Sequence, residues 1–295
     1  MPRMSNGVVE VGVPDWCGPR VLHFGAVGGP NVLGAVPAAF TETSLGRWHP
    51  RGGHRLWVAP ESMPGSYAPD DRPVELVSPG PLTRTLRAAP DATGIEKQID
   101  LELLPDAPVM VVRHRIVNRT YWPILVAPWA ITIVDPAGTA ILPQPPHRTH
   151  AEQLLPSRTM VQWAYTDFTD SRWHIGRHLV RLTPDQHKPS AQKIGIANEA
   201  GWSAVLLGTQ AFFKLAAWKP DARYPDLGSH TEVFTAGAYL ELETLGALSL
   251  IEPGASSGHT EVWMVVDVPR ALSDEAALAE WCASTAERGR GALDP

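Results

Sequence analysis

Gln98-Ile-Asp-Leu-Glu-Leu103 is the stretch that points most directly to the fold, because apolar and polar side chains alternate along it. A period of two is typical of a β-strand with one buried face and one exposed face. Apolar or alternating runs of similar length recur along the chain, at 109–117, 124–126, 131–134, 178–182, 203–207, 211–215, 239–245 and 261–266. Turn residues such as Pro105-Asp-Ala-Pro108 separate the runs. We therefore expect an all-β protein with many short strands.

A helical period is clear only near the end of the chain. Ser273 is a suitable N-cap, and Leu278, Trp281 and Thr285 then fall on one side. We expect one C-terminal helix at about 273–290, packed on the outside of the sheets. No composition shift marks a domain boundary, so residues 1–295 are expected to form a single domain with a β-sandwich at about 8–268. The proline-rich segments 59–75 and 143–158 are expected to be long, functional loops.

Composition excludes several classes of protein. The 295 residues include 25 basic and 31 acidic side chains, 44% are hydrophobic and only 19% are charged, which argues against disorder and against a nucleic-acid partner. The most apolar run, 124–134, contains Pro128 and is shorter than the roughly 20 residues of a membrane span, so no membrane partner is expected. The N-terminus lacks the apolar run of a secretory signal, and the two cysteines do not resemble a disulfide framework. We therefore expect a cytoplasmic protein.

No cofactor and no metal ion is expected from the motifs. The sequence contains no Walker loop, no G-x-G-x-x-G and no G-x-S-x-G. Two histidine pairs have ligand-like spacing, His147 with His150 and His174 with His178, but neither has a third ligand nearby in sequence.

Three stretches follow one another in a characteristic order. They are Arg51-Gly-Gly-His-Arg-Leu-Trp-Val-Ala-Pro-Glu61, then Asn118 with Pro123-Ile-Leu-Val-Ala-Pro-Trp129, then Leu240-Glu-Leu-Glu-Thr-Leu-Gly-Ala-Leu248 followed by Pro253-Gly254 and His259-Thr-Glu-Val-Trp263. Together they resemble the galactose mutarotase-like superfamily, which includes aldose-1-epimerases and hexose-6-phosphate epimerases. The resemblance covers about residues 15–268. It implies a large antiparallel β-supersandwich whose concave sheet binds a sugar.

The resemblance also implies a general base. Mutarotation needs one group that takes the proton of the anomeric hydroxyl and another that protonates the ring oxygen. Glu243 matches the general-base glutamate of the family, within Leu-Glu-Thr. On a strand, Glu241, Glu243 and Tyr239 share one face, so Glu241 is a second candidate ligand contact. The alternative is that this face is only the solvent side of a half-buried strand.

The general acid does not match the family. Its histidine falls near Trp129, and an indole can stack on a pyranose but cannot act as a general acid. His54 in the Gly-Gly loop is the best substitute, and His114 is the second. Arg51 and Arg55 flank His54 and are expected to orient the sugar, which makes an anionic sugar one option. The alternative for the arginines is pairing with Glu61 or Asp70.

Five further residues are candidate substrate contacts because of their residue type and their position in the sequence. Trp57, Trp129 and Trp163 could stack on sugar C–H faces, although most of the 11 tryptophans must be core. Lys214 is expected either to meet Glu232 or Glu243 or to be an exposed edge lysine. Gln144 is a polar candidate on a loop.

The function expected from these residues is aldose 1-epimerase-like acid/base chemistry on a sugar or sugar derivative, with Glu243 as base and His54 as acid. Two alternatives stay open. One is a carbohydrate lyase or hydrolase on the same scaffold, using a histidine, Tyr165 or paired carboxylates. The other is a non-catalytic sugar-binding or sensing protein, which Trp129 favours.

Overall fold

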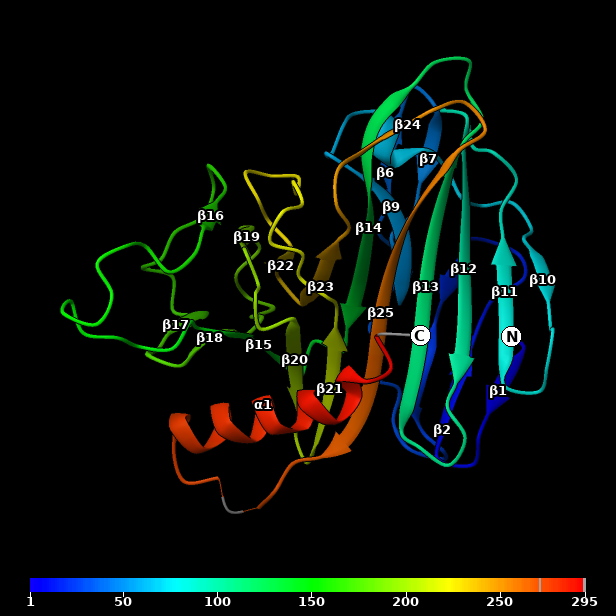
Figure 1. The fold of residues 1–295 in the computed structure, drawn as a ribbon. Coiled ribbons are helices and arrows are strands. Elements are labelled where there is room, and N and C mark those ends of the chain that lie inside the picture. Colours follow the sequence, from blue (N-terminus) through cyan, green and yellow to red (C-terminus); the bar gives the residue numbers. More distant parts are fainter. Residues whose placement is uncertain (271, 294–295) are drawn as a thin grey trace.

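Two large antiparallel sheets dominate the computed structural model, which describes residues 1–270 and 272–293 (Figure 1). The ten-stranded sheet has the order β10 (Glu75–Val77), β11 (Thr83–Arg87), β12 (Ile95–Leu103), β13 (Val109–Asn118), β25 (Ser256–Asp267), β21 (Gln210–Leu215), β20 (Trp202–Leu207), β15 (Thr139–Pro143), β18 (Leu179–Leu182) and β17 (Trp173–Ile175). The eight-stranded sheet has the order β16 (Met160–Gln162), β19 (Gln192–Ile196), β22 (Thr231–Ala236), β23 (Tyr239–Leu245), β14 (Ile124–Val134), β9 (His54–Ala59) and β3 (Arg20–Val21), with β24 (Ser249–Ile251) paired to β14.

Three smaller sheets and a helix complete the fold. The sheets are β1 (Arg3–Ser5) with β2 (Val9–Gly12) and β4 (His23–Ala26), β5 (Ala35–Val36) with β8 (Arg51–Gly52), and β6 (Thr41–Thr43) with β7 (Gly46–Trp48). A 3₁₀ turn, η1 (Gly65–Tyr67), interrupts one long loop, and α1 (Glu275–Arg290) is the last regular element of the described chain. The prediction of an all-β protein with one C-terminal helix is confirmed. Within the described residues, no helix combines the length and apolar character that a membrane crossing requires.

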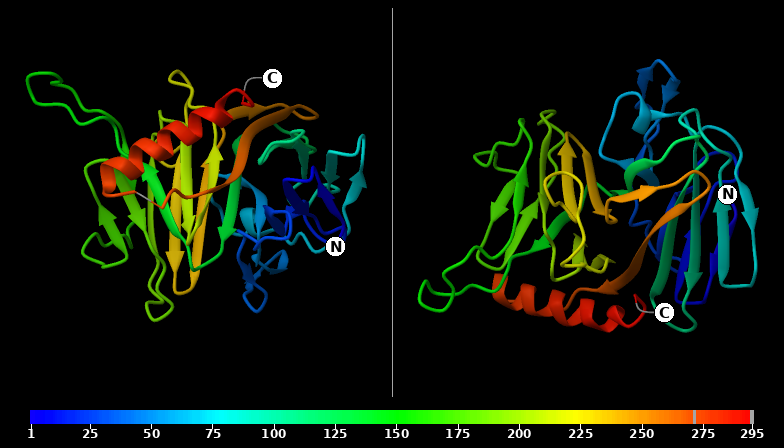
Figure 2. Two further views of the ribbon diagram at one scale, coloured as in Figure 1. Left: turned by 90° about the horizontal axis from the view of Figure 1, so that it is seen from below. Right: turned by 45° about the horizontal axis from the view of Figure 1, so that its top comes forward.

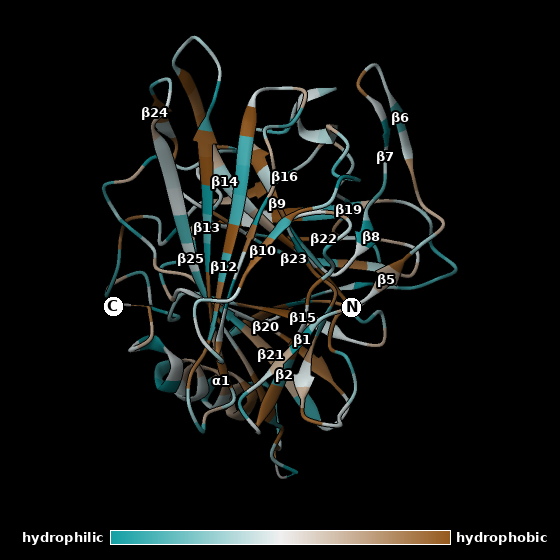
Figure 3. Cartoon of the chain, turned by 90° about the vertical axis from the view of Figure 1, so that its right-hand side faces the viewer, coloured by the Kyte–Doolittle hydropathy of each residue, from teal (hydrophilic) through white to brown (hydrophobic). Residues whose placement is uncertain are grey.

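The main core lies between the two large sheets. Leu242 and Ile194 project into it from the eight-stranded sheet, and Ile99 and Val112 project from the ten-stranded sheet. Burial of each such side chain contributes roughly 1.5–3 kcal/mol relative to exposure. In Figure 3, β12 carries both teal and brown segments, in keeping with the alternating polar and apolar residues of its sequence. Each strand's alternation therefore assigns one of its faces to this core.

Strand β14 joins two runs that the sequence separates at Pro128. Residues 124–126 pair with β24, and residues 129–134 pair with β23. Pro128 lies between these two ladders, where its missing N–H breaks neither of them, and its carbonyl accepts from Gly246 N at 2.9 Å. This placement explains how a proline is accommodated inside an 11-residue strand.

Helix α1 covers the outer face of the ten-stranded sheet (Figure 2). Leu278 is buried there, and the ring of Trp281 lies 5.6 Å from that of Phe213. The N-cap is Asp274, not Ser273 as the sequence suggested, because the Asp274 carboxylate accepts a hydrogen bond from Ala277 N at 2.9 Å. The helix therefore begins slightly later than predicted.

The Gly52-Gly53 pair sets the entry into β9. Gly52 and Gly53 have φ values of +110° and +64°, and a Cβ at Gly53 would lie 2.1 Å from the Val21 carbonyl oxygen. Only glycine tolerates both the left-handed backbone and this close approach. The turn thus fixes which residues of β9 face the core and which face outward.

Candidate active site

A pocket of about 830 Å³ lies over the face of the eight-stranded sheet that is turned away from the main core. Aromatic rings form much of its wall, contributed by Trp48, Trp57, Tyr67, Trp129, Tyr165, Phe234 and Tyr239. Its charged lining residues are Arg55, Glu61, Lys193 and Glu241. The strands β9, β14, β19, β22 and β23 each direct side chains into it, since alternate residues of each strand share this face.

Glu241 is the carboxylate of the sheet that lines the pocket. Its Oε1 lies 2.9 Å from Arg55 Nη2 and accepts a hydrogen bond from the Tyr239 hydroxyl at 2.8 Å. Burial raises the pKa of Glu241, an effect that Arg55 opposes and the nearby Glu243 reinforces. Arg55 also lies 4.6 Å from the ring centre of Trp57. Of its donors, Nε and Nη1 have no hydrogen-bond partner within the described chain, although both atoms are buried.

Glu243 lies beside the pocket but is fully buried. Its Oε2 accepts a hydrogen bond from Trp129 Nε1 at 2.8 Å and is 3.0 Å from Lys193 Nζ. Lys193 also pairs with Glu232 at 2.7 Å, and its ammonium lies 4.8 Å from the ring centres of both Trp129 and Trp163. Two carboxylates therefore share one ammonium behind the aromatic wall.

Glu232 is a fully buried carboxylate of this group. Burial, together with Glu243 on the paired strand, raises the pKa of Glu232 well above its ordinary value of 4.5, although Lys193 opposes the shift.

Two tyrosines from loops add hydroxyl groups. Tyr67 donates a hydrogen bond to Glu61, and burial is the main cause that raises the pKa of Tyr67. Burial likewise raises the pKa of Tyr165 to about 12. The Tyr165 hydroxyl makes no hydrogen bond to any residue in the described part of the chain, so it is a protonated donor available to a ligand.

The structure brings together part of the predicted site. Arg55, Trp57, Trp129 and Glu241 line the pocket. Glu243 and Trp163 do not line the pocket, but both contact Lys193, which does. The expected shared face of Glu241, Glu243 and Tyr239 is present, because Leu240, Leu242 and Thr244 turn toward the other side of β23 and are buried.

His54 and Lys214 lie elsewhere. Both are fully buried between the two large sheets, because His54 precedes Arg55 on β9 and so occupies the opposite face. Lys214 pairs with Glu261 at 2.9 Å and meets neither Glu232 nor Glu243. His114, the second candidate acid, lies beside His54. We therefore do not retain either histidine as the acid of this pocket.

Arg51 and Gln144 also lie outside the pocket lining. The Arg51 guanidinium is 5.0 Å from the ring centre of Trp16, on a backbone with φ of +59°. Gln144 lies on the loop after β15, where its Oε1 accepts a hydrogen bond from Arg158 Nη2 at 2.5 Å beside a different cavity of about 280 Å³. Neither residue can contact a ligand in the larger pocket from these positions.

Sequence reasoning missed Lys193, Glu61 and Tyr67. Alternation in Gln192-Lys-Ile-Gly-Ile196 could have indicated Lys193. Ile194 and Ile196 face the core, so Lys193, at an alternate position of the strand, must face the other side of the sheet. Glu61 and Tyr67 come from the 59–75 segment, which was expected to be a functional loop and does line the pocket. The other long loop, at 143–158, does not line it.

One group of side chains in the described residues could hold a metal ion, namely His54, His114 and Glu261 between the sheets. The histidine pairs 147/150 and 174/178 belong to no such group of three in residues 1–270 and 272–293.

No family profile and no curated protein matches the chain in sequence. Solved structures do match in fold. A galactose mutarotase-like protein from Lactobacillus casei is 9% identical, with a TM-score of 0.56 over 90% of this chain and 100% of that one. A galactose mutarotase related enzyme from Lactobacillus acidophilus is 8% identical, with a TM-score of 0.56 over 90% and 97% of the two chains. The resemblance seen in the sequence is thus confirmed at the level of the fold, and the chain has the galactose mutarotase-like fold.

Proposed function

We propose that the pocket binds a neutral sugar in its cyclic form. The observation that carries the proposal is the aromatic wall of Trp48, Trp57 and Trp129 beside a charged floor in which Arg55 is paired with Glu241. Aromatic faces suit the C–H faces of a pyranose, and paired charges with free N–H groups suit its hydroxyls.

The charge balance favours a neutral sugar over an anionic one. Arg55 is paired with Glu241, and Lys193 is shared by Glu232 and Glu243. Arg51, which would have added a third cation, lies outside the lining. A phosphate or carboxylate would therefore meet carboxylates as well as the two cations, and its desolvation would be poorly offset.

We further propose that the pocket catalyses mutarotation, with Glu241 in place of Glu243 as base. Glu241 takes the proton of the anomeric hydroxyl while Tyr165 donates its proton to the ring oxygen, and the bond between the anomeric carbon and the ring oxygen breaks. Rotation of the open-chain aldehyde followed by the reverse transfers closes the other anomer. The raised pKa of Glu241 makes its carboxylate a stronger base.

Two-dimensional NMR exchange spectroscopy on free aldoses, 6-phosphorylated aldoses and uronic acids tests both proposals. We expect wild-type protein to accelerate α/β exchange of a free aldose and to leave the anionic sugars unaffected. Glu241→Gln and Tyr165→Phe should each lower the acceleration by about 100-fold or more. Gln144→Ala, which lies at a different cavity, is the matched control and should keep the full rate.

Non-catalytic sugar binding is the second candidate function. It is favoured by the absence of a histidine from the pocket lining in the described residues and by the ion pairing of both Glu241 and Glu243. Line broadening of a free aldose without faster exchange would establish this function instead. Cleavage of an oligosaccharide would point to a lyase or hydrolase, and no response to any sugar would refute the binding proposal.

A further inference from the structure

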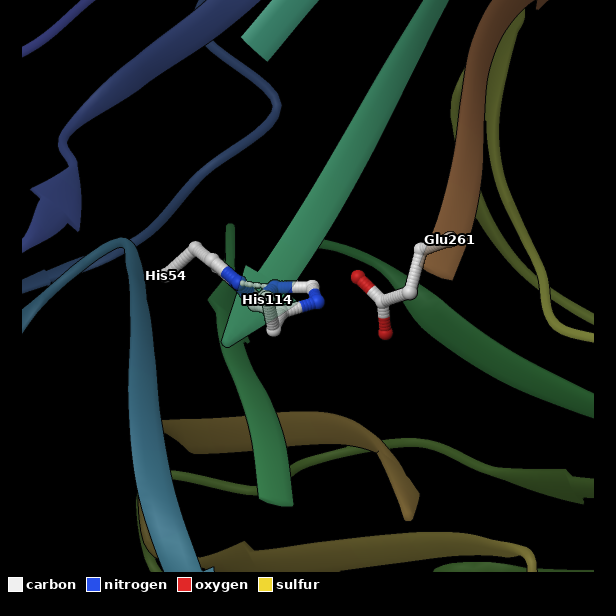
Figure 4. A group of neighbouring side chains, drawn as sticks. All are labelled: His54, His114 and Glu261. Atoms are coloured by element: carbon white, nitrogen blue, oxygen red, sulfur yellow. Dashed lines mark hydrogen bonds between the residues drawn. The ribbon is translucent and has the colours of Figure 1, made fainter. Parts of the chain in front are cut away.

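A second group of polar side chains lies between the two large sheets. His54 on β9, His114 on β13 and Glu261 on β25 are all buried, and Figure 4 shows the two imidazoles together with the carboxylate facing them. Burying such groups is costly unless they have partners or a ligand. The proposed sugar chemistry uses none of the three.

The two imidazoles are held in the way that metal-binding histidines are held. His54 Nδ1 lies 2.9 Å from Thr132 Oγ1, and His114 Nδ1 lies 3.0 Å from the His259 carbonyl oxygen. An oxygen partner on one ring nitrogen fixes the orientation of the ring and leaves the other nitrogen for a metal. The two remaining nitrogens, both Nε2, face each other at 2.7 Å.

Glu261 supplies an oxygen ligand from the neighbouring strand. One ligand atom from each of the three residues lies within 4.8 Å of the others. The carboxylate is oriented by Trp263 Nε1, which donates to Oε2 at 2.8 Å, and by the Thr244 hydroxyl. Two ligand atoms at tetrahedral zinc are about 3.3 Å apart, so to admit an ion the imidazole nitrogens must separate by about 0.6 Å and the carboxylate must move closer to them.

We propose that His54, His114 and Glu261 bind a divalent transition-metal ion, with Zn²⁺ as the best match to two imidazoles and a carboxylate. The ion would link the sheets, because β9 belongs to the eight-stranded sheet while β13 and β25 belong to the ten-stranded one. The site is separate from the sugar pocket, since His54 and Arg55 project from opposite faces of β9. Stabilisation of the folded chain is the role that follows from this position.

Lys214 is the group that competes with the ion. Its ammonium lies 2.9 Å from Glu261 Oε1, and it also donates to Thr132 Oγ1 at 2.8 Å and to the Leu242 carbonyl at 3.0 Å. An ammonium beside a divalent ion is unfavourable, so binding must weaken the Lys214–Glu261 pair. Removing the ammonium should therefore tighten metal binding, which distinguishes a metal site from a permanent Lys214–Glu261 ion pair.

A second cavity adjoins the site. His114 and His259 line it, at about 630 Å³, together with the exposed residue Arg115. We take this cavity, which is separate from the sugar pocket, as the side from which an ion enters.

Titration of the chelator-treated full chain with Co²⁺ and Zn²⁺ tests the proposal. We expect one equivalent of Co²⁺ to bind, with visible absorption typical of mixed nitrogen and oxygen ligation, and Zn²⁺ to raise Tm. His54→Gln and His114→Gln should each weaken Co²⁺ binding by about 100-fold. His174→Gln, an exposed histidine with ligand-like spacing, is the control and should bind as wild type does.

Lys214→Met gives the decisive comparison if the histidine variants fold poorly. We expect its Co²⁺ dissociation constant to be about tenfold lower than that of wild type, and its Tm to rise more on metal addition. Wild-type protein that binds no Co²⁺ and shows no change in Tm would overturn the proposal. So would Co²⁺ binding that persists unchanged in both His54→Gln and His114→Gln.

Discussion

At the scale of single residues, the hydrogen bond from Trp129 to Glu243 joins the aromatic wall to the buried charges behind it. Trp129→Phe keeps an aromatic ring but removes the donor, so a buried carboxylate oxygen loses a partner. We expect the free energy of unfolding to fall by about 1–3 kcal/mol, measured by urea denaturation. Trp57→Phe is the matched control in the same wall, since no hydrogen bond from its indole nitrogen is present among the described residues. Equal losses in the two variants would show that ring size, not the hydrogen bond, matters.

Glu232 makes stability depend on pH. Because burial and Glu243 raise its pKa above 4.5, folded protein keeps a proton that the unfolded chain has already released. Stability contributed by this proton is present below pH 4.5 and is lost as the pH rises through the folded-state pKa. Between pH 4.5 and the folded-state pKa of Glu232, we expect the free energy of unfolding of wild type to fall by about 1.4 kcal/mol per pH unit relative to that of Glu232→Gln.

Urea denaturation of both proteins at a series of pH values from 4 to 8 measures the difference. Glu232→Gln carries no proton there to release, so its curve should be flatter. Parallel curves for the two proteins would mean that Lys193 keeps Glu232 ionised throughout.

Residue patterns predicted some of these positions and not others. The resemblance indicated Glu243, and the alternation along 239–245 then placed Glu241 on the same face of β23. Which of the two reaches the ligand depends on Trp129 and Lys193, and these come from other strands. His54 was misplaced because a motif position says nothing about which face of β9 a side chain occupies; its neighbour Arg55, one residue later, lines the pocket.

At the scale of elements, the N-terminal end of α1 depends on one capping side chain. Asp274→Ala removes the acceptor for Ala277 N, and we expect a loss of about 1 kcal/mol in the free energy of unfolding, from urea denaturation. Ser273→Ala tests the cap that the sequence suggested and should leave stability unchanged. A larger loss in Ser273→Ala than in Asp274→Ala would place the start of the helix at the earlier residue.

Elements with a clear period were the most predictable. The strand at 239–245 has the predicted bounds, and the alternating run at 98–103 lies within β12. The separate runs at 124–126 and 131–134 form one strand, because β14 changes partners at Pro128 and needs no N–H at that point. A partner change is a property of the sheet, so no local pattern could reveal it.

At the scale of the whole molecule, the pocket is assembled from residues between 35 and 241 that the eight-stranded sheet and the segments beside it bring together. The sequence showed which stretches carry the resemblance but not that Lys193 and Tyr67 complete the wall. The interior polar group was missed for the same reason. His54, His114 and Glu261 are far apart in sequence, and each alone is indistinguishable from an ordinary core residue.

The buried histidines also set how the whole molecule responds to acid. His230 is buried against Tyr224, and burial lowers its pKa to about 4 from an ordinary 6.5. Between pH 6.5 and about 4, His230 is therefore protonated in the unfolded protein but neutral in the folded protein. Stability from the neutral His230 is complete above pH 6.5 and is lost as the pH falls toward 4.

His230→Phe isolates this effect, because phenylalanine fits among the same aromatic rings and does not titrate. From pH 7 to pH 4 we expect wild type to lose about 3 kcal/mol more than His230→Phe in the free energy of unfolding, measured by urea denaturation. Glu232 is present in both proteins, so its opposite pH dependence cancels in the comparison. A constant difference between the two curves would mean that His230 titrates alike in both states, so that its proton reaches water even inside the folded chain.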